Sequence, residues 1–139
     1  MIKVFFDASV IFSALYSNQG GSNKLAQLVR QKKIVGITSQ TVIEELQENL
    51  GKIDKLDFRK FHQFILDFGF IVRERIAQPE IKPFLGLVDS RDAHVVAGAV
   101  LTGCDYLVTL DKKHLDNRTI KTKISQVKIV SPKELLATI

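Results

Sequence analysis

Five short apolar runs alternate with longer segments in which apolar residues recur at helical spacing, and this alternation constrains the fold more than any other feature. The runs lie at residues 2–6, 34–38, 69–72, 106–109 and 127–130. Short runs rich in β-branched and aromatic residues are typical of buried strands. Strands that are separated by helices pair in parallel, and the helices then cover the sheet. The sequence therefore predicts an α/β fold, a three-layer α/β/α sandwich with a central parallel sheet of four to five strands.

The intervals between these runs predict helices and one loop. Helices are expected over residues 8–16, 22–32, 39–49, 56–68 and 89–102, and from Pro132 onward. The interval 73–88 contains Pro79 and Pro83, and we expect it to form a loop. Because no linker, repeat or low-complexity segment divides the 139 residues, we expect a single domain over residues 1–139.

Composition and charge narrow the classes of function. Because Cys104 is the single cysteine, a disulfide within the chain is excluded, and a cysteine-based zinc site is not expected. The net charge of +5 and the pI of about 9.4 favour a polyanionic partner, and nucleic acid is the usual one. The N-terminal residues do not have the pattern of a signal peptide, and no apolar stretch is long enough to span a bilayer. We therefore expect a cytoplasmic protein without a membrane partner.

Acidic residues stand where the predicted elements meet one edge of the sheet. Asp7 directly follows the first strand, and Asp111 lies two residues beyond the fourth. Asp92 lies in the first turn of the helix before the fourth strand, and Glu45 lies on the helix after the second. In open parallel sheets, sites form beyond the carboxyl ends of the strands, near the point where the strand order reverses. All four carboxylates can therefore converge on one site.

A cluster of carboxylates requires compensation for its charge. Acids that lie a few ångströms apart repel one another, and one of them protonates unless a cation is bound. Oxygen ligands without a histidine or cysteine cluster suit hard cations, which here means Mg²⁺ or Mn²⁺. A basic exterior around such a site is what a phosphodiesterase that acts on a polyanion requires.

Four motifs in this order resemble those of the PIN domain family, over essentially the whole chain. They are FDAS at residues 6–9, EEL at 44–46, DSRDAH at 89–94 and YLVTLDK at 106–112. The chain is most similar to the toxin-type, VapC-like PIN proteins of bacteria and archaea, which cut RNA and are often paired with an antitoxin. The resemblance implies a metal-dependent endoribonuclease, with RNA as substrate, a small antitoxin protein as partner and a homodimeric state.

The resemblance also assigns roles to individual residues. Asp7, Glu45, Asp92 and Asp111 match the acidic metal site of the family. Ser9 matches the position that orients Asp7, and Thr109 matches the hydroxyl that supports Asp111. Glu44 is an alternative to Glu45, which we prefer because it directly precedes Leu46, as in the family pattern. Leu110 is a departure, because glycine is common at that position in these relatives.

Asp89 and the three histidines have simpler interpretations. Asp89 is expected to cap the helix that begins there, which leaves Asp92 free for the site. His62, His94 and His114 are scattered along the chain, and surface or packing roles are expected for them. Contact with the substrate is an alternative for His94, because it is close to Asp92.

Two alternative functions use the same fold class. A phosphatase of the haloacid-dehalogenase type would use Asp7 as a covalent nucleophile, helped by Thr38, Lys112 and Asp111. Ser9 counts against it, because such enzymes usually carry a second aspartate there. The third hypothesis is a non-catalytic module that holds RNA or a protein.

Overall fold

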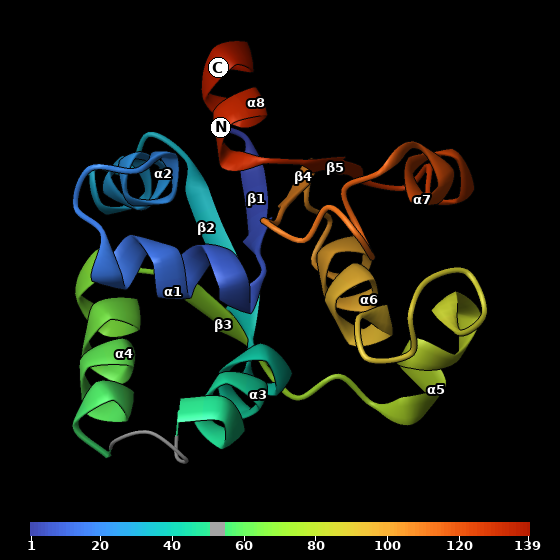
Figure 1. The fold of residues 1–139 in the computed structure, drawn as a ribbon, viewed down its shortest axis with the longest axis horizontal. Coiled ribbons are helices and arrows are strands. Elements are labelled where there is room, and N and C mark those ends of the chain that lie inside the picture. The colour runs from blue at the N-terminus through green and yellow to red at the C-terminus, as the bar shows by residue number, and fades with distance from the viewer. Residues whose placement is uncertain (51–54) are drawn as a thin grey trace.

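The computed structural model describes residues 1–50 and 55–139, and its strands form one parallel sheet (Figure 1). The strands are β1 (Lys3–Phe6), β2 (Val35–Ser39), β3 (Ile71–Arg73), β4 (Tyr106–Val108) and β5 (Lys128–Val130). They lie in the order β3-β2-β1-β4-β5, and every neighbouring pair is parallel. The predicted α/β/α sandwich with a five-stranded parallel sheet is confirmed.

Helices cover both faces of the sheet. They are α1 (Ala8–Tyr16), α2 (Gly21–Arg30), α3 (Gln40–Leu50), α4 (Lys55–Phe68), α5 (Gln78–Ile81), α6 (Ala93–Leu101), α7 (Arg118–Lys123) and α8 (Pro132–Thr138). Helices α1, α2 and α4 lie on one side of the sheet in Figure 1, whereas α5, α6 and α7 lie on the other. No helix within the described residues is long and apolar enough to cross a membrane.

Two short elements differ from the sequence prediction. The predicted loop over 73–88 contains α5 and the 3-10 helix η1 (Lys82–Phe84). Pro79 and Pro83 stand in the first turns of these two elements, where a missing N–H removes no helical hydrogen bond. Helix α7 was not predicted, because it has six residues, none of them buried, and therefore no apolar stripe. Its N-terminus is set instead by the side chain of Asn117, which accepts a hydrogen bond from the Ile120 N–H.

Strand β1 is the centre of the fold, because its side chains enter two separate cores. Val4 and Phe6 pack into the cluster under α1, α2 and α4, and Phe5 points into the cluster under α6. Strand β2 pairs with one edge of β1 and β4 with the other, so the strand order reverses at β1. The Asp7 N–H extends the pairing with β4 by donating to the Val108 carbonyl at 3.1 Å. Asp7 therefore emerges at the switch point, where a site is expected.

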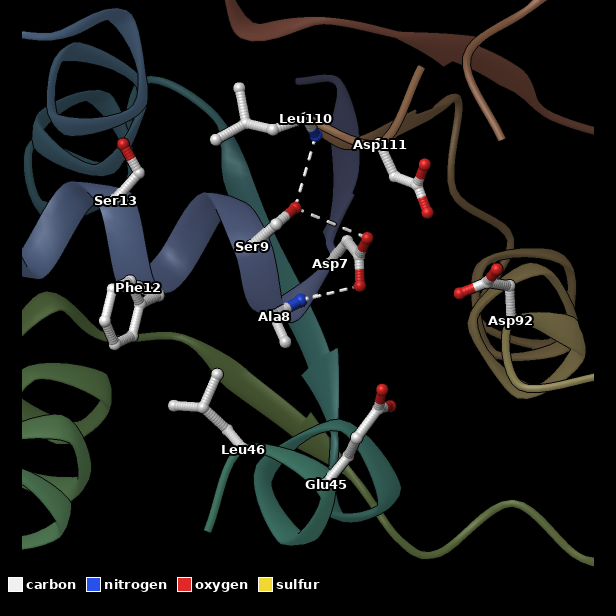
Figure 2. A pocket seen from close by; sticks show the side chains of 10 residues that line it. All are labelled: Asp7, Ala8, Ser9, Phe12, Ser13, Glu45, Leu46, Asp92, Leu110 and Asp111. Atoms are coloured by element: carbon white, nitrogen blue, oxygen red, sulfur yellow. Dashed lines mark hydrogen bonds between the residues drawn. The ribbon is translucent and has the colours of Figure 1, made fainter. Parts of the chain in front are cut away.

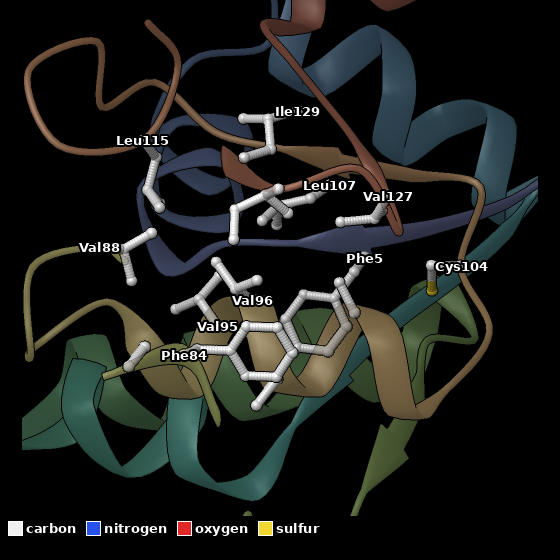
Figure 3. Close-up of a cluster of buried hydrophobic side chains, with 14 of the residues drawn as sticks. Phe5, Phe84, Val88, Val95, Val96, Cys104, Leu107, Leu115, Val127 and Ile129 are labelled. Atoms are coloured by element: carbon white, nitrogen blue, oxygen red, sulfur yellow. The ribbon is translucent and has the colours of Figure 1, made fainter. Parts of the chain in front are cut away.

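The second core cluster depends on a close approach between β1 and α6. Phe5 is fully buried among apolar side chains from α6, β4 and β5 (Figure 3). A Cβ atom added at Gly98, inside α6, would lie 2.7 Å from Cζ of Phe5 and 2.9 Å from its Cε2. Glycine at this position therefore lets the helix that follows Asp92 lie directly against the central strand.

We predict that Gly98→Ala destabilises the protein. Alanine would gain about 1 kcal/mol of helix propensity, but overpacking a closed core costs about 1–3 kcal/mol, so a net loss of up to about 2 kcal/mol is expected. Urea denaturation measures this change in the free energy of unfolding. Gly21→Ala is the matched control, because its added Cβ would meet Pro132 Cβ at an ordinary 3.4 Å. A Gly98→Ala variant as stable as Gly21→Ala would contradict the close-packing argument.

Candidate active site

A pocket of about 560 Å³ lies at the carboxyl ends of the strands, and all four predicted acids line it. The lining residues are Asp7, Ala8, Ser9, Phe12, Ser13, Glu45, Leu46, Asp92, Leu110 and Asp111. Figure 2 shows the four carboxylates, which come from four different segments, directed toward a common space. Apolar side chains form the opposite wall. The structure therefore brings together Asp7, Glu45, Asp92 and Asp111.

Asp7 is the most deeply placed of these acids. It is only 9% exposed, and its Oδ1 accepts a hydrogen bond from the Ala8 N–H at 2.7 Å. Its Oδ2 accepts a hydrogen bond of 2.7 Å from the Thr109 hydroxyl. Burial raises the pKa of Asp7 and the nearby charge of Glu45 adds to this, whereas the bonds from Thr109 and Ala8 oppose it. The two hydrogen bonds therefore fix the orientation of a carboxylate that burial alone would tend to protonate.

Thr109 connects the ends of the two central strands. Its hydroxyl oxygen accepts the Asp111 N–H at 3.1 Å, while its single proton goes to Asp7. The sequence predicted support of Asp111, and the structure shows that the same hydroxyl also holds Asp7. Ser9, the other supporting residue, donates to Asp7 Oδ2 over a longer 3.4 Å and accepts the Leu110 N–H at 3.2 Å.

Asp92 occupies the N-cap position of α6 but makes no capping hydrogen bond with its side chain. Its carboxylate is therefore free to face the pocket. Partial burial, followed by repulsion from Asp7, Asp111 and Asp89, raises the pKa of Asp92 to about 6. Such a shift is typical of a carboxylate in a crowded acidic site.

The prediction that Asp89 caps this helix is wrong. Residues 90–92 form a turn, and α6 begins only at Ala93. The Asp89 carboxylate accepts the Arg91 N–H at 2.9 Å and pairs with the Arg91 guanidinium at 3.1 Å. These bonds lower the pKa of Asp89 to about 2, and its role is to shape the turn that presents Asp92.

His114 joins the site beside Asp111, although only a surface or packing role is expected for it from the sequence. The backbone N–H of His114 donates a hydrogen bond to Asp111 Oδ1 at 2.9 Å, and the ring Nδ1 of His114 lies 3.3 Å from Asp111 Oδ2. One ligand atom from each of Asp92, Asp111 and His114 lies within 4.8 Å of the others. In the sequence, His114 lies three residues after Asp111, and this spacing brings two side chains together when the segment forms a turn. The apolar pattern does not reveal that turn.

Glu45, rather than Glu44, faces the pocket. Glu44 turns away and forms an ion pair with Arg75, with a distance of 2.6 Å between Nη2 and Oε1. Glu45 Oε2 lies 2.7 Å from Nε2 of His94, a residue that is 9% exposed. His94 was expected to be a surface or packing residue, and its bond to Glu45 is a contact between segments that are far apart in the sequence.

The donor set fits a divalent cation of the hard class. Four carboxylates line one pocket. Burial raises the pKa of Asp7 and that of Asp92, and the charges of neighbouring carboxylates raise them further. A bound cation would relieve this repulsion. The set required by the phosphatase hypothesis is not assembled, because Thr38 is fully buried and donates to the Phe6 carbonyl at 3.1 Å.

Comparison with known proteins decides the family. The model of the PIN domain family matches residues 3–113, a span that includes all four acids. The chain belongs to the PIN domain family. His114 lies one residue beyond the matched span of this PIN domain.

Solved structures share the fold at low sequence identity. VapBC2 from Rickettsia felis, bound to a DNA fragment from their promoter, gives a TM-score of 0.68 at 16% identity, over 94% of this chain and 98% of that chain. PAE2754 from Pyrobaculum aerophilum gives 0.63 at 17% identity, over 99% and 94% of the two chains. FitAB bound to an IR36 DNA fragment gives 0.63 at 12% identity, over 93% and 94%. No curated protein sequence matches this chain.

We predict that Asp92→Asn stabilises the metal-free PIN domain at neutral pH. The pKa of about 6 in the folded state lies above the ordinary 3.8, so the ionised Asp92 opposes folding fully above pH 6, and this effect weakens as the pH falls and is lost below 3.8. In EDTA, the variant should melt about 2–4 °C higher than wild type near pH 7.5 and only about 1 °C higher near pH 4.5.

Asp89→Asn is the matched control for this experiment. Arg91 lowers the pKa of Asp89 to about 2, so its charge favours folding and its loss should lower the melting temperature at both pH values. Identical shifts in melting temperature for the two variants would contradict the prediction that the pKa values of Asp92 and Asp89 are shifted in opposite directions.

Proposed function

We propose that this PIN domain is a metal-dependent endoribonuclease that hydrolyses phosphodiester bonds of RNA. The observation that supports this most directly is the convergence of Asp7, Glu45, Asp92 and Asp111 in one pocket at the switch point of the sheet. These four residues would hold Mg²⁺ or Mn²⁺. When bound, such a cation supplies Lewis-acid stabilisation of the charge that develops on the phosphate.

The protein's own residues prepare the site for that reaction. Thr109 and Ala8 hold the Asp7 carboxylate in one orientation, so that little reorganisation is required when a ligand binds. The Asp92 carboxylate has no capping bond to break. Among the described residues, the pocket lining contains no lysine or arginine, so the described basic residues that contribute to the chain's net charge of +5 lie outside the pocket, where they favour the approach of a polyanion. RNA as the substrate follows from the family resemblance and this charge.

We further propose that the protein acts as the toxin of a toxin–antitoxin pair. The names of two similar structures, VapBC2 and FitAB, denote complexes, both bound to DNA. By analogy, a small antitoxin protein would be the partner of this chain, and a homodimer would be its own assembly. Both expectations rest on the resemblance in fold.

We predict that the wild-type protein cleaves RNA when Mn²⁺ or Mg²⁺ is present and that EDTA abolishes cleavage. Asp7→Asn should reduce the rate at least about 100-fold, because it removes a charge from the centre of the acid cluster. Glu45→Gln should also reduce it. The measurement is the initial rate on a labelled RNA, with each variant's melting curve recorded to confirm folding.

Glu44→Gln is the control for Glu45→Gln, because its carboxylate pairs with Arg75 outside the pocket. It should cleave RNA at the wild-type rate. Equal cleavage by wild type and Asp7→Asn would refute the assignment. Hydrolysis of small phosphate monoesters without RNA cleavage would favour the phosphatase instead.

A second prediction concerns the toxin role. Induced expression of the wild-type protein alone in bacteria should arrest growth, and expression of Asp7→Asn at the same level should not. Growth curves measure this, with immunoblots to match the amounts. Cleavage of RNA in vitro without growth arrest by the wild type would contradict the toxin role but leave the ribonuclease activity standing.

A further inference from the structure

Glu45 is held in the site differently from the three aspartates. Asp7 and Asp111 accept hydrogen bonds from backbone N–H groups near them in the sequence, and Asp92 has a short side chain on the N-cap residue of α6. Glu45 has a longer side chain that is 40% exposed. It lines both the acidic pocket and a neighbouring one formed by Thr41, Glu44, Glu48, Arg91 and His94. Its carboxylate can therefore turn toward either space unless another group holds it.

His94 supplies that group. It is the second residue of α6, two positions after Asp92, and its Nε2 lies 2.7 Å from Glu45 Oε2. Among the described residues, it is the side chain that the structure shows bonded to the Glu45 carboxylate. The start of α6 thus presents Asp92 to the site and, through His94, also holds the acid that comes from α3. Figure 2 shows Asp92 and Glu45 facing the same space from these two elements.

The other ring nitrogen of His94 indicates why this position carries an imidazole. Nδ1 is buried and has no hydrogen-bond partner among the described residues. A buried N–H without an acceptor is costly, so the ring proton belongs on Nε2, where it is donated to Glu45. An apolar side chain would fill this space without leaving a polar atom unpaired. Packing therefore does not account for the histidine, whereas the bond to Glu45 does.

We propose that His94 is a positioning residue, whose Nε2–H holds the Glu45 carboxylate toward Asp7, Asp92 and Asp111 and thereby sets the affinity of the site for a divalent cation. The inference rests on the proposed metal site and adds a residue outside its carboxylates. Groups that orient metal ligands in this way typically change metal affinity about 10–100-fold when they are removed.

The test is Mn²⁺ binding by isothermal titration calorimetry, which does not depend on turnover. His94→Leu fills the space without a donor, and it should weaken Mn²⁺ binding about 10-fold. His94→Gln places an amide N–H the same number of bonds from Cα as Nε2, and it should keep the affinity within about threefold of wild type. If His94→Leu does not fold, His94→Asn replaces it, because its amide is one bond too short to reach Glu45.

A double-mutant cycle separates positioning from a general structural effect. Glu45→Gln should weaken Mn²⁺ binding, and His94→Leu in that background should weaken it no further. Fully additive losses would overturn the proposal, as would wild-type affinity in His94→Leu. A loss in His94→Gln as large as that in His94→Leu would also overturn it, because the donor would then not matter.

The same titrations distinguish this inference from the proposed function. If wild type binds no Mn²⁺, both the metal site and the role of His94 are refuted. If wild type binds Mn²⁺, Asp7→Asn does not, and His94→Leu binds as wild type does, only the role of His94 is refuted.

Discussion

Asp7 carries a carboxylate that is 9% exposed at the end of the central strand, and the rest of the site is arranged around it. Burial disfavours its charge, and the Ala8 N–H and the Thr109 hydroxyl offset this with two bonds of 2.7 Å. The second bond requires β4 to lie beside β1, and the core requires α6 to pack closely on Phe5 at Gly98. The strand order is therefore a condition for the hydrogen bond from Thr109 that opposes the protonation of Asp7.

Charge in this protein is separated in space. The chain has a net charge of +5, yet one pocket gathers four carboxylates. Asp89 and Asp92 show that the environment separates identical side chains, because Arg91 lowers the pKa of Asp89, whereas partial burial and then neighbouring acids raise the pKa of Asp92. The unfavourable charge is retained where a cation would be bound, as expected when a site is selected for binding rather than for stability.

Two histidines add a layer of contacts around the acids. His114 contacts Asp111 through its backbone and its ring, and His94 contacts Glu45. Both acids approach the pocket from segments outside β1, and each has a side chain that could otherwise rotate. Oriented ligands reduce the reorganisation that metal binding requires, so these contacts would add to the affinity that the acids themselves supply.

The sequence by itself determined the sheet, the helices that have an apolar stripe, and the three aspartates at element ends, because strand and helix periodicities and strand-end positions are local properties. Glu45, inside α3, was assigned mainly through the family resemblance. The sequence did not reveal α7, which lacks such a stripe, or the turn that removes Asp89 from the helix. Only the tertiary structure decided that Thr109 donates to Asp7, 102 residues away, and that His94 meets Glu45 across 49 residues. The physical reason is that a hydrogen bond requires a donor–acceptor distance that is correct to within a few tenths of an ångström. Packing between distant segments sets this distance.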